Sequence, residues 1–144
     1  MNLSRKAALG VAVCAAGALL SGTTGTASAY YGDLYGAYAV TVLGNQWHIA
    51  YTYNAPDQAT ADSHAMDLCG YSDCVIPVRW VNGCAALVDR DGDLYTGLGR
   101  TLVEASRNAL AASGPDPNPL MVSLGSAEPS QAKVLDSRCT ANAG

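Results

Sequence analysis

The sequence predicts an α+β fold of two ββα-type repeats, in which an antiparallel sheet carries two alanine-rich helices and is bridged by disulfides. In each half, two strand-like segments precede a segment with helical periodicity. The halves align at an offset of 44 residues, where Ala61 and Ala65 meet Ala105 and Ala109. Small residues at matched helical positions indicate helices that lie close to the strands.

The first repeat opens with a hairpin and continues into a helix. Tyr35–Val42 is rich in tyrosine, valine and threonine, and Trp47–Tyr53 alternates as the returning strand. Asp57 is a natural N-cap for the helix that follows. Gly70 stands where a helix C-terminus favours a residue with positive φ, so the helix ends there.

A third strand joins the two repeats. Cys74–Val81 is rich in β-branched residues, and Pro77 places it at a sheet edge or a bulge because proline donates no ladder hydrogen bond. The second hairpin then pairs Cys84–Asp89 with Asp93–Gly97. Thr101 and Glu104 have the spacing of a capping box, which predicts the start of the second helix.

The segment after the second helix departs from the repeat. Residues 114–131 are an inserted proline-rich linker and loop: Gly114–Pro119 is extended because alternate prolines exclude a helix. Leu120–Leu124 is assigned as a short strand and Lys133–Cys139 as the last strand. The tail, Thr140–Gly144, is expected to fray.

The first 29 residues have the pattern of a secretory signal peptide. Basic Arg5 and Lys6 precede the apolar run Ala7–Leu20, and an Ala-x-Ala end places cleavage after Ala29. We therefore expect one secreted, extracellular domain over residues 30–144, with no membrane span once the signal peptide is removed.

Composition and charge exclude some partners. Without Arg5 and Lys6, six basic residues oppose twelve acidic ones, a net charge of −6. Nucleic acids and anionic membranes favour clustered basic residues, so neither is an expected partner. We expect a monomer or a weak dimer.

Four cysteines remain after cleavage: Cys69, Cys74, Cys84 and Cys139. An even number in a small exported domain indicates disulfides, and four cysteines allow three pairings. We favour Cys69 with Cys74 and Cys84 with Cys139, and the other two pairings stay open. The spacing does not fit a C-x-x-C redox motif, and a zinc site lacks nearby histidine ligands apart from His64.

Several of these elements together resemble the bacterial family called domain of unknown function 4189, in particular its short exported actinobacterial members. They are Tyr35-Gly36-Ala37, Cys69-Gly70-x-x-x-Cys74, Asn82-Gly83-Cys84 and the final Cys139. The resemblance covers about Tyr35–Ser113 and implies secretion, a cysteine-bridged α+β domain and no catalytic residues to transfer. Ser113 stands where many members have a cysteine, and Leu120–Gln131 looks like an added segment.

No catalytic, cofactor-binding or metal-binding residues are predicted. The acidic run Asp89–Asp93 lacks the glycine and glutamate positions of an EF-hand, so it is interpreted as a hairpin turn. His48 and His64 have no evident nucleophile partner, and the common hydrolase and nucleotide-binding motifs are missing from the sequence. We therefore do not expect an enzyme, although a cryptic hydrolase site at either histidine is a third hypothesis.

Aromatic residues give the remaining functional indication. The favoured interpretation is that these rings form the core of a chain that has no phenylalanine, and the alternative is a face rich in tyrosine and tryptophan that contacts a protein or a cell-envelope glycan. The favoured function is a non-catalytic extracellular binding protein, and the alternative is an inhibitor or immunity protein against a secreted hydrolase. The candidate interaction surface is Trp47, Tyr51, Tyr53, Trp80 and Tyr95.

Overall fold

The computed structural model describes residues 32–144, whose strands form two three-stranded antiparallel sheets. The first sheet has the order β2 (Gln46–Ala55), β1 (Tyr35–Leu43), β3 (Val75–Val81). The second has the order β5 (Asp93–Gly99), β4 (Cys84–Arg90), β6 (Lys133–Cys139). Both sheets share one connectivity, with the first strand of each half in the middle. The predicted signal peptide, residues 1–29, lies outside the described residues.

Helix α1 (Gln58–Cys69) begins and ends where its local sequence predicts. The side chain of Asp57 accepts a hydrogen bond from the backbone N–H of Thr60 at 2.7 Å, so it is the N-cap. Gly70 ends the helix with φ of 74°, in the left-handed region that suits glycine.

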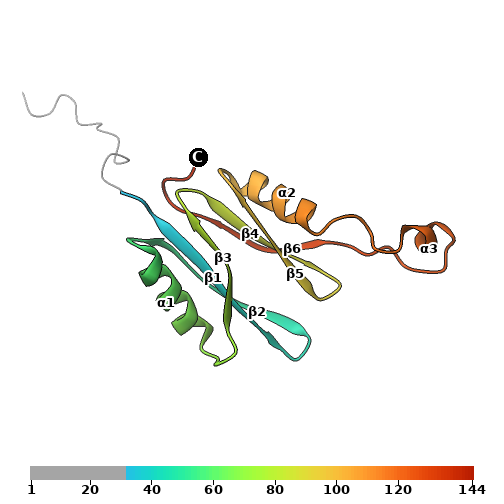
Figure 1. Cartoon of the computed structure of the whole chain (residues 1–144), viewed down its shortest axis with the longest axis horizontal. Helices are drawn as coiled ribbons and strands as arrows, with labels where there is room; N and C mark the ends of the chain where they lie inside the picture. The colour runs from blue at the N-terminus through green and yellow to red at the C-terminus, as the bar shows by residue number, and fades with distance from the viewer. Residues whose placement is uncertain (1–31) are drawn as a thin grey trace, which may run out of the picture. The chain divides into compact units, whose positions relative to one another are not determined.

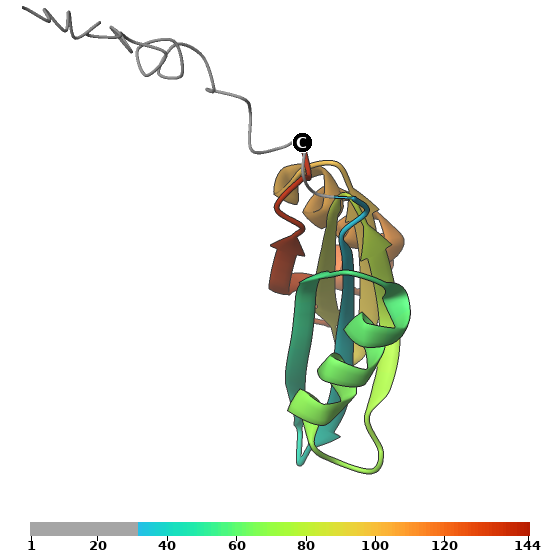
Figure 2. The same cartoon turned by 90° about the vertical axis from the view of Figure 1, so that its left-hand side faces the viewer.

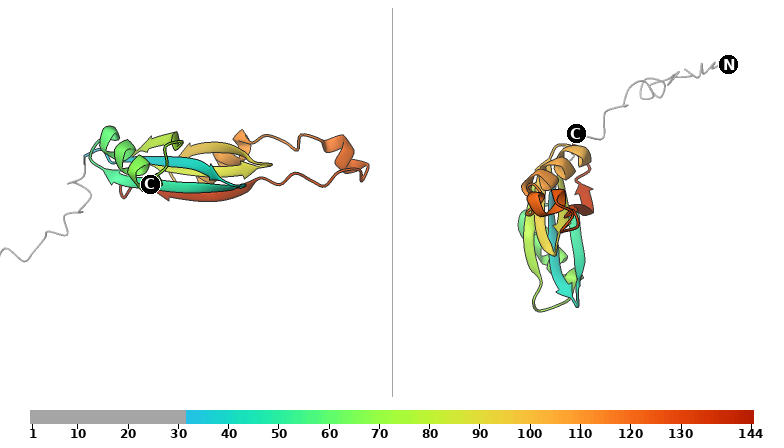
Figure 3. Two further views of the ribbon diagram at one scale, coloured as in Figure 1. Left: turned by 90° about the horizontal axis from the view of Figure 1, so that it is seen from below. Right: turned by 90° about the vertical axis from the view of Figure 1, so that its right-hand side faces the viewer.

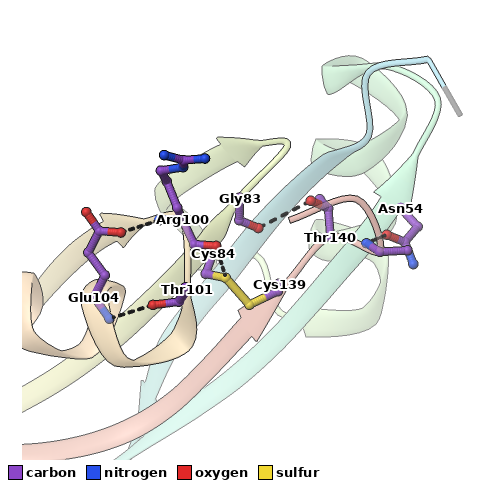
Figure 4. Close-up of a disulfide and its surroundings, with 9 residues drawn as sticks. Asn54, Gly83, Cys84, Arg100, Thr101, Glu104, Cys139 and Thr140 are labelled. Carbon is purple, nitrogen blue, oxygen red and sulfur yellow. Dashed lines mark hydrogen bonds between the residues drawn. A yellow bond between two sulfur atoms is a disulfide. The ribbon is translucent and has the colours of Figure 1, made fainter. Parts of the chain in front are cut away.

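Helix α2 (Leu102–Ala112) has the predicted cap in a slightly shifted form. The hydroxyl of Thr101 accepts from the backbone N–H of Glu104 at 3.2 Å. The carboxylate of Glu104 accepts in return from the N–H of Arg100, one residue before the N-cap, at 2.8 Å (Figure 4). Two backbone donors that the helix itself cannot satisfy are thereby paired.

The elements form four layers, with α1 on the outer face of the first sheet and α2 on the outer face of the second (Figures 1 and 2). Ala37 and Ala39 of β1 pack toward α1, whereas Tyr38 and Val40 pack between the sheets. The α+β class and the antiparallel pairing are confirmed, and the strands divide between two sheets instead of sharing one. Because β1 and β4 are covered on both faces, their sequences lack the polar alternation of a half-exposed strand.

The helices lie close to the sheets because small residues face each other. A Cβ atom added to Gly97 of β5 would lie 2.2 Å from the backbone nitrogen of Ala109 and 2.4 Å from the carbonyl oxygen of Ala105. Both alanines are fully buried. Helix α2 can therefore reach this depth only over a glycine.

Two disulfides confirm the favoured pairing. Cys69, at the end of α1, is bonded to Cys74 just before β3. Cys84 of β4 is bonded to Cys139 of β6, which faces it directly in the strand register (Figure 4). The second bridge closes a sequence separation of 55 residues, so it joins the start of the second repeat to the end of the chain.

Two expectations about the last third of the chain are wrong. Residues 119–123 form a short helix, α3 (Pro119–Ser123), and not a strand, since no other strand lies beside them to pair. The C-terminal tail is held: Thr140 is buried, its backbone N–H donates to the carbonyl of Gly83 at 2.9 Å, and the N–H of Ala141 donates to Asn54 at 2.7 Å (Figure 4). These hydrogen bonds hold the tail, one of them buried between Thr140 and Gly83, where fraying is expected from the sequence.

Pro77 lies where its chemistry predicts. Strand β3 is an edge strand of the first sheet, and its pairing with β1 is irregular between Val75 and Val78. Within residues 32–144, no helix is long and apolar enough to cross a membrane.

Candidate functional site

The five aromatic residues of the candidate interaction surface do not form one exposed surface, because Trp47, Tyr51 and Trp80 all pack in the core between the sheets. Trp80 is only 4% exposed and packs against Tyr38 in the core between the sheets, with ring centroids 5.1 Å apart. Tyr95 packs on the other face of the second sheet, in the cluster beneath α2. The second sheet covers Trp80, and it also separates Tyr95 from β2. Neither ring is therefore available to a partner that binds the face of β2.

Trp47 links the two sheets by a hydrogen bond. Its indole N–H donates to the carboxylate of Asp89 on β4 at 2.9 Å, and its ring packs against the intersheet core. The polar end of this ring is therefore occupied within the protein.

Tyr51 and Tyr53 do lie together, on one face of β2 as their spacing predicts. Their rings are stacked with centroids 6.1 Å apart, and Tyr53 is 47% exposed. The guanidinium of Arg138, on β6, lies 4.3 Å from the centroid of the Tyr51 ring. This cation–π contact holds the Tyr51 ring against a side chain of β6, in the second sheet.

A groove opens between this edge and α1; we call it the β2–α1 groove. It has a volume of about 400 Å³ and an apolar lining. Leu68 of α1, which lines it, is 64% exposed. The groove is lined by Tyr51, Thr52 and Tyr53 of β2 and by His64, Asp67 and Leu68 of α1.

The two histidines lie in different places. His64 lines the β2–α1 groove together with Asp67. His48 lies on β2 against Tyr71, with ring centroids 5.3 Å apart and planes nearly perpendicular. Neither has a hydrogen bond to a serine, cysteine or carboxylate side chain among the described residues.

A buried polar network crosses between the sheets. Tyr38 of β1 is fully buried, and its hydroxyl donates to Asp136 of β6 at 3.2 Å. Arg138 donates to the same carboxylate oxygen at 3.1 Å. Burial raises the pKa of Tyr38 far above its ordinary value, and the negative charge of Asp136 raises it further. The phenol is therefore a neutral hydrogen-bond donor, which is a structural role.

The acidic run Asp89–Asp93 is a hairpin turn, as its spacing predicts. Asp91 and Gly92 have positive φ and connect β4 to β5. Its carboxylates point to separate partners: Asp89 holds Trp47, and Asp91 accepts from the hydroxyl of Ser130 at 2.6 Å. In the part of the chain that the structure describes, no cluster of three or more ligating side chains could hold a metal ion.

Residues 114–132 form an arm that projects away from both sheets and carries α3 (Figures 1 and 3). Its tip exposes three large apolar side chains: Leu120 at 68%, Leu124 at 67%, and Met121, nearly half of whose surface is exposed. We call these three residues the arm tip. Contiguous exposed apolar side chains are typical of surfaces that contact another molecule, so the arm tip is a candidate contact site.

The base of the arm is fixed by hydrogen bonds. The carboxylate of Asp116 accepts from the N–H of Asn118 at 2.8 Å and from the N–H of Ser130 at 2.7 Å, so one side chain joins the outgoing and returning segments. The bond from Ser130 to Asp91 attaches this base to the β4–β5 turn. The arm therefore leaves the sheets in a defined direction.

The arm tip is the candidate site that sequence reasoning missed. The sequence predicts a strand over Leu120–Leu124, and pairing in a sheet would cover part of the surface of these residues. The available signal was the combination of Pro119 at a helix N1 position with three apolar residues inside a segment otherwise rich in proline, glycine and serine.

Comparisons with known proteins show a family match and several relatives. The model of a family described as a domain of unknown function, DUF4189, matches residues 35–117, which excludes the arm tip. Protein Rv1269c and Protein MT1307 of Mycobacterium tuberculosis and Protein Mb1300c of Mycobacterium bovis are each 35% identical over 82 residues. That alignment covers 57% of this chain and 63% of each relative, so the chain spans less than two thirds of their length. No solved structure matches the chain significantly.

Proposed function

This chain belongs to the DUF4189 family, and from that premise we propose that it is an exported, non-catalytic binding protein that contacts a partner protein through its arm. The observation that carries the proposal is the exposed arm tip. Exposing Leu120 and Leu124 to water is unfavourable, and burying them against a partner recovers about 1.5–3 kcal/mol for each side chain.

Export is part of the proposal. The basic start, apolar run and Ala-x-Ala end at Ala29 support cleavage by a signal peptidase. The pairing of Cys69, Cys74, Cys84 and Cys139 in two disulfides supports an oxidising, extracellular location.

The test is quantitative capture of secreted and cell-envelope proteins by the oxidised protein. The variant replaces Leu120 and Leu124 by serine. The matched control replaces Leu102 and Val103, two exposed apolar residues on the outer face of α2, also by serine. We expect a partner that the native protein and the control both capture and that the arm-tip variant loses. Equal capture by all three proteins would contradict a role for the arm.

A second candidate function is inhibition of a secreted hydrolase, and the fixed base of the arm favours it. A projecting loop that is held in one direction loses little entropy when it enters a cleft. If the captured partner is a hydrolase, its activity on its own substrate is measured with the native protein and with a variant lacking residues 125–131. Inhibition by the native protein alone supports this candidate.

A further inference from the structure

The outer edge of β2 has unused hydrogen-bonding groups. In the first sheet β2 pairs only with β1, so no described strand is hydrogen-bonded to its other edge. The hairpin closes with Leu43 opposite Gln46 after a two-residue turn. The pair that closes the turn is hydrogen-bonded, and non-hydrogen-bonded pairs alternate with hydrogen-bonded pairs from there. The N–H and C=O groups of Trp47, Ile49 and Tyr51 therefore point away from β1, toward the free edge.

The β2–α1 groove runs beside this edge. Its lining is apolar. Two of its lining residues are substantially exposed: Tyr53 on β2 and Leu68 on α1. A strand added to β2 would place alternate side chains toward the groove, as in recognition by strand addition. The irregular pairing near Asn54, whose φ is 62°, sets the end of the usable edge.

Charge indicates which strand would fit. Asp67 lines the groove and forms no ion pair with any described residue. The described residues have six basic against twelve acidic side chains, a net charge of −6. A second copy of this chain would bring the same negative charge to the edge, so self-pairing is disfavoured and a basic strand is favoured.

We propose that the outer edge of β2 and the β2–α1 groove bind an extended basic peptide segment as a fourth strand of the first sheet. The outward backbone groups of Trp47, Ile49 and Tyr51 pair with the peptide backbone. Alternate side chains of the peptide enter the groove, where the methylene stem of a basic side chain packs against Leu68 and its charged end faces Asp67. This site is separate from the arm and goes beyond the proposed function.

The probes are capped eight-residue synthetic peptides added to the oxidised protein. One alternates valine and lysine, and its counterpart alternates valine and glutamate. Two further versions of the valine–lysine peptide are N-methylated, one on every valine and one on every lysine. Calorimetry measures binding, and amide hydrogen exchange followed by NMR locates it.

We expect the valine–lysine peptide to bind at least about tenfold more tightly than the glutamate peptide. Exchange of the amides of Trp47, Ile49 and Tyr51 should slow in the complex. Since only one alternate set of peptide amides faces β2, one N-methylated version should lose binding and the other keep it. Binding without slower exchange at β2, or equal binding of both methylated versions, would overturn strand addition.

Variants test the groove itself. Leu68→Ala should weaken peptide binding, whereas Leu102→Ala, at an exposed leucine of α2, should not. Asp67→Asn should weaken it about two- to fivefold, the range for one exposed ion pair. The arm-tip variant should bind the peptide normally, so loss of the arm's partner and loss of this site are distinguishable. Binding of no peptide, or sedimentation showing a dimer whose β2 amides are protected, would overturn the proposal.

Discussion

The hydroxyl of Tyr38 donates a hydrogen bond to Asp136 across the space between the two sheets, at 3.2 Å. Tyr38 belongs to the central strand of the first sheet and Asp136 to an edge strand of the second, 98 residues later. A buried hydroxyl without a partner would be costly, so this bond fixes how the sheets are placed against each other. Arg138 completes the network at the solvent side.

Replacing Tyr38 by phenylalanine should change how stability depends on pH. The folded-state pKa of Tyr38 is raised above its ordinary value of 10.0, so its contribution is fully present below pH 10 and is lost as the unfolded chain ionises at higher pH. Tyr38→Phe should cost about 1.5–3 kcal/mol at pH 7, the range for a hydrogen bond to a charged group. Its urea-unfolding free energy should then fall less than that of the native protein above pH 10. Parallel curves for Tyr38→Phe and the native protein would contradict the assignment.

The two disulfides should contribute unequally to stability. Their sequence separations are 5 residues for Cys69–Cys74 and 55 for Cys84–Cys139. In the chain-entropy model, the shorter loop contributes about 2 kcal/mol and the longer one about 4 kcal/mol. Replacing both cysteines of each pair by serine, followed by denaturant unfolding, measures the difference. A larger loss from the short bridge would show that native-state contacts, and not loop entropy, dominate.

Gly97→Ala should destabilise the contact between β5 and α2. The added methyl group would meet the backbone of Ala109 and Ala105 at well under contact distance, so the helix must move outward. We expect a loss of about 1–3 kcal/mol, the range for overpacking a core, measured by denaturant unfolding. Gly32→Ala adds the same atom where nothing lies within 4 Å and should be neutral. Equal stability of the two variants would show that α2 does not lie as close as described.

The secreted material should carry two chemical signatures. N-terminal sequencing should find Tyr30 first, because the Ala-x-Ala end directs cleavage after Ala29. Intact-mass measurement should find the chain lighter by four hydrogen atoms than its reduced form, since four thiols are joined in two bonds. Retention of the first 29 residues would contradict the export proposal, and free thiols would contradict the extracellular location.

Local chemistry made much of the fold predictable. Asp57 and Thr101 cap helices because a side-chain oxygen reaches a backbone N–H two or three residues later, which depends only on neighbours in sequence. Gly70 ends its helix for an equally local reason, and Pro77 excluded a central strand. Tyr51 and Tyr53 share a face because strand side chains alternate.

The candidate sites were less predictable. Alternation shows which side of a strand a ring occupies and says nothing about what covers it, so the sequence alone left both a core and a surface position open for Trp80. The structure buries it between the sheets at 4% exposure. The arm tip was missed because a short apolar segment has no periodicity that separates a paired strand from an exposed turn of helix.

The sequence by itself determined the order of hairpins and helices, the capping residues and the nearness of Cys69 to Cys74, since these follow from interactions between residues close along the chain. Only the tertiary structure decided that the strands form two sheets packed face to face, that Thr140 is held by Gly83, and that Leu120 and Leu124 are left uncovered. Contacts between distant segments, and the solvent they exclude or admit, have no signature within a short stretch of residues.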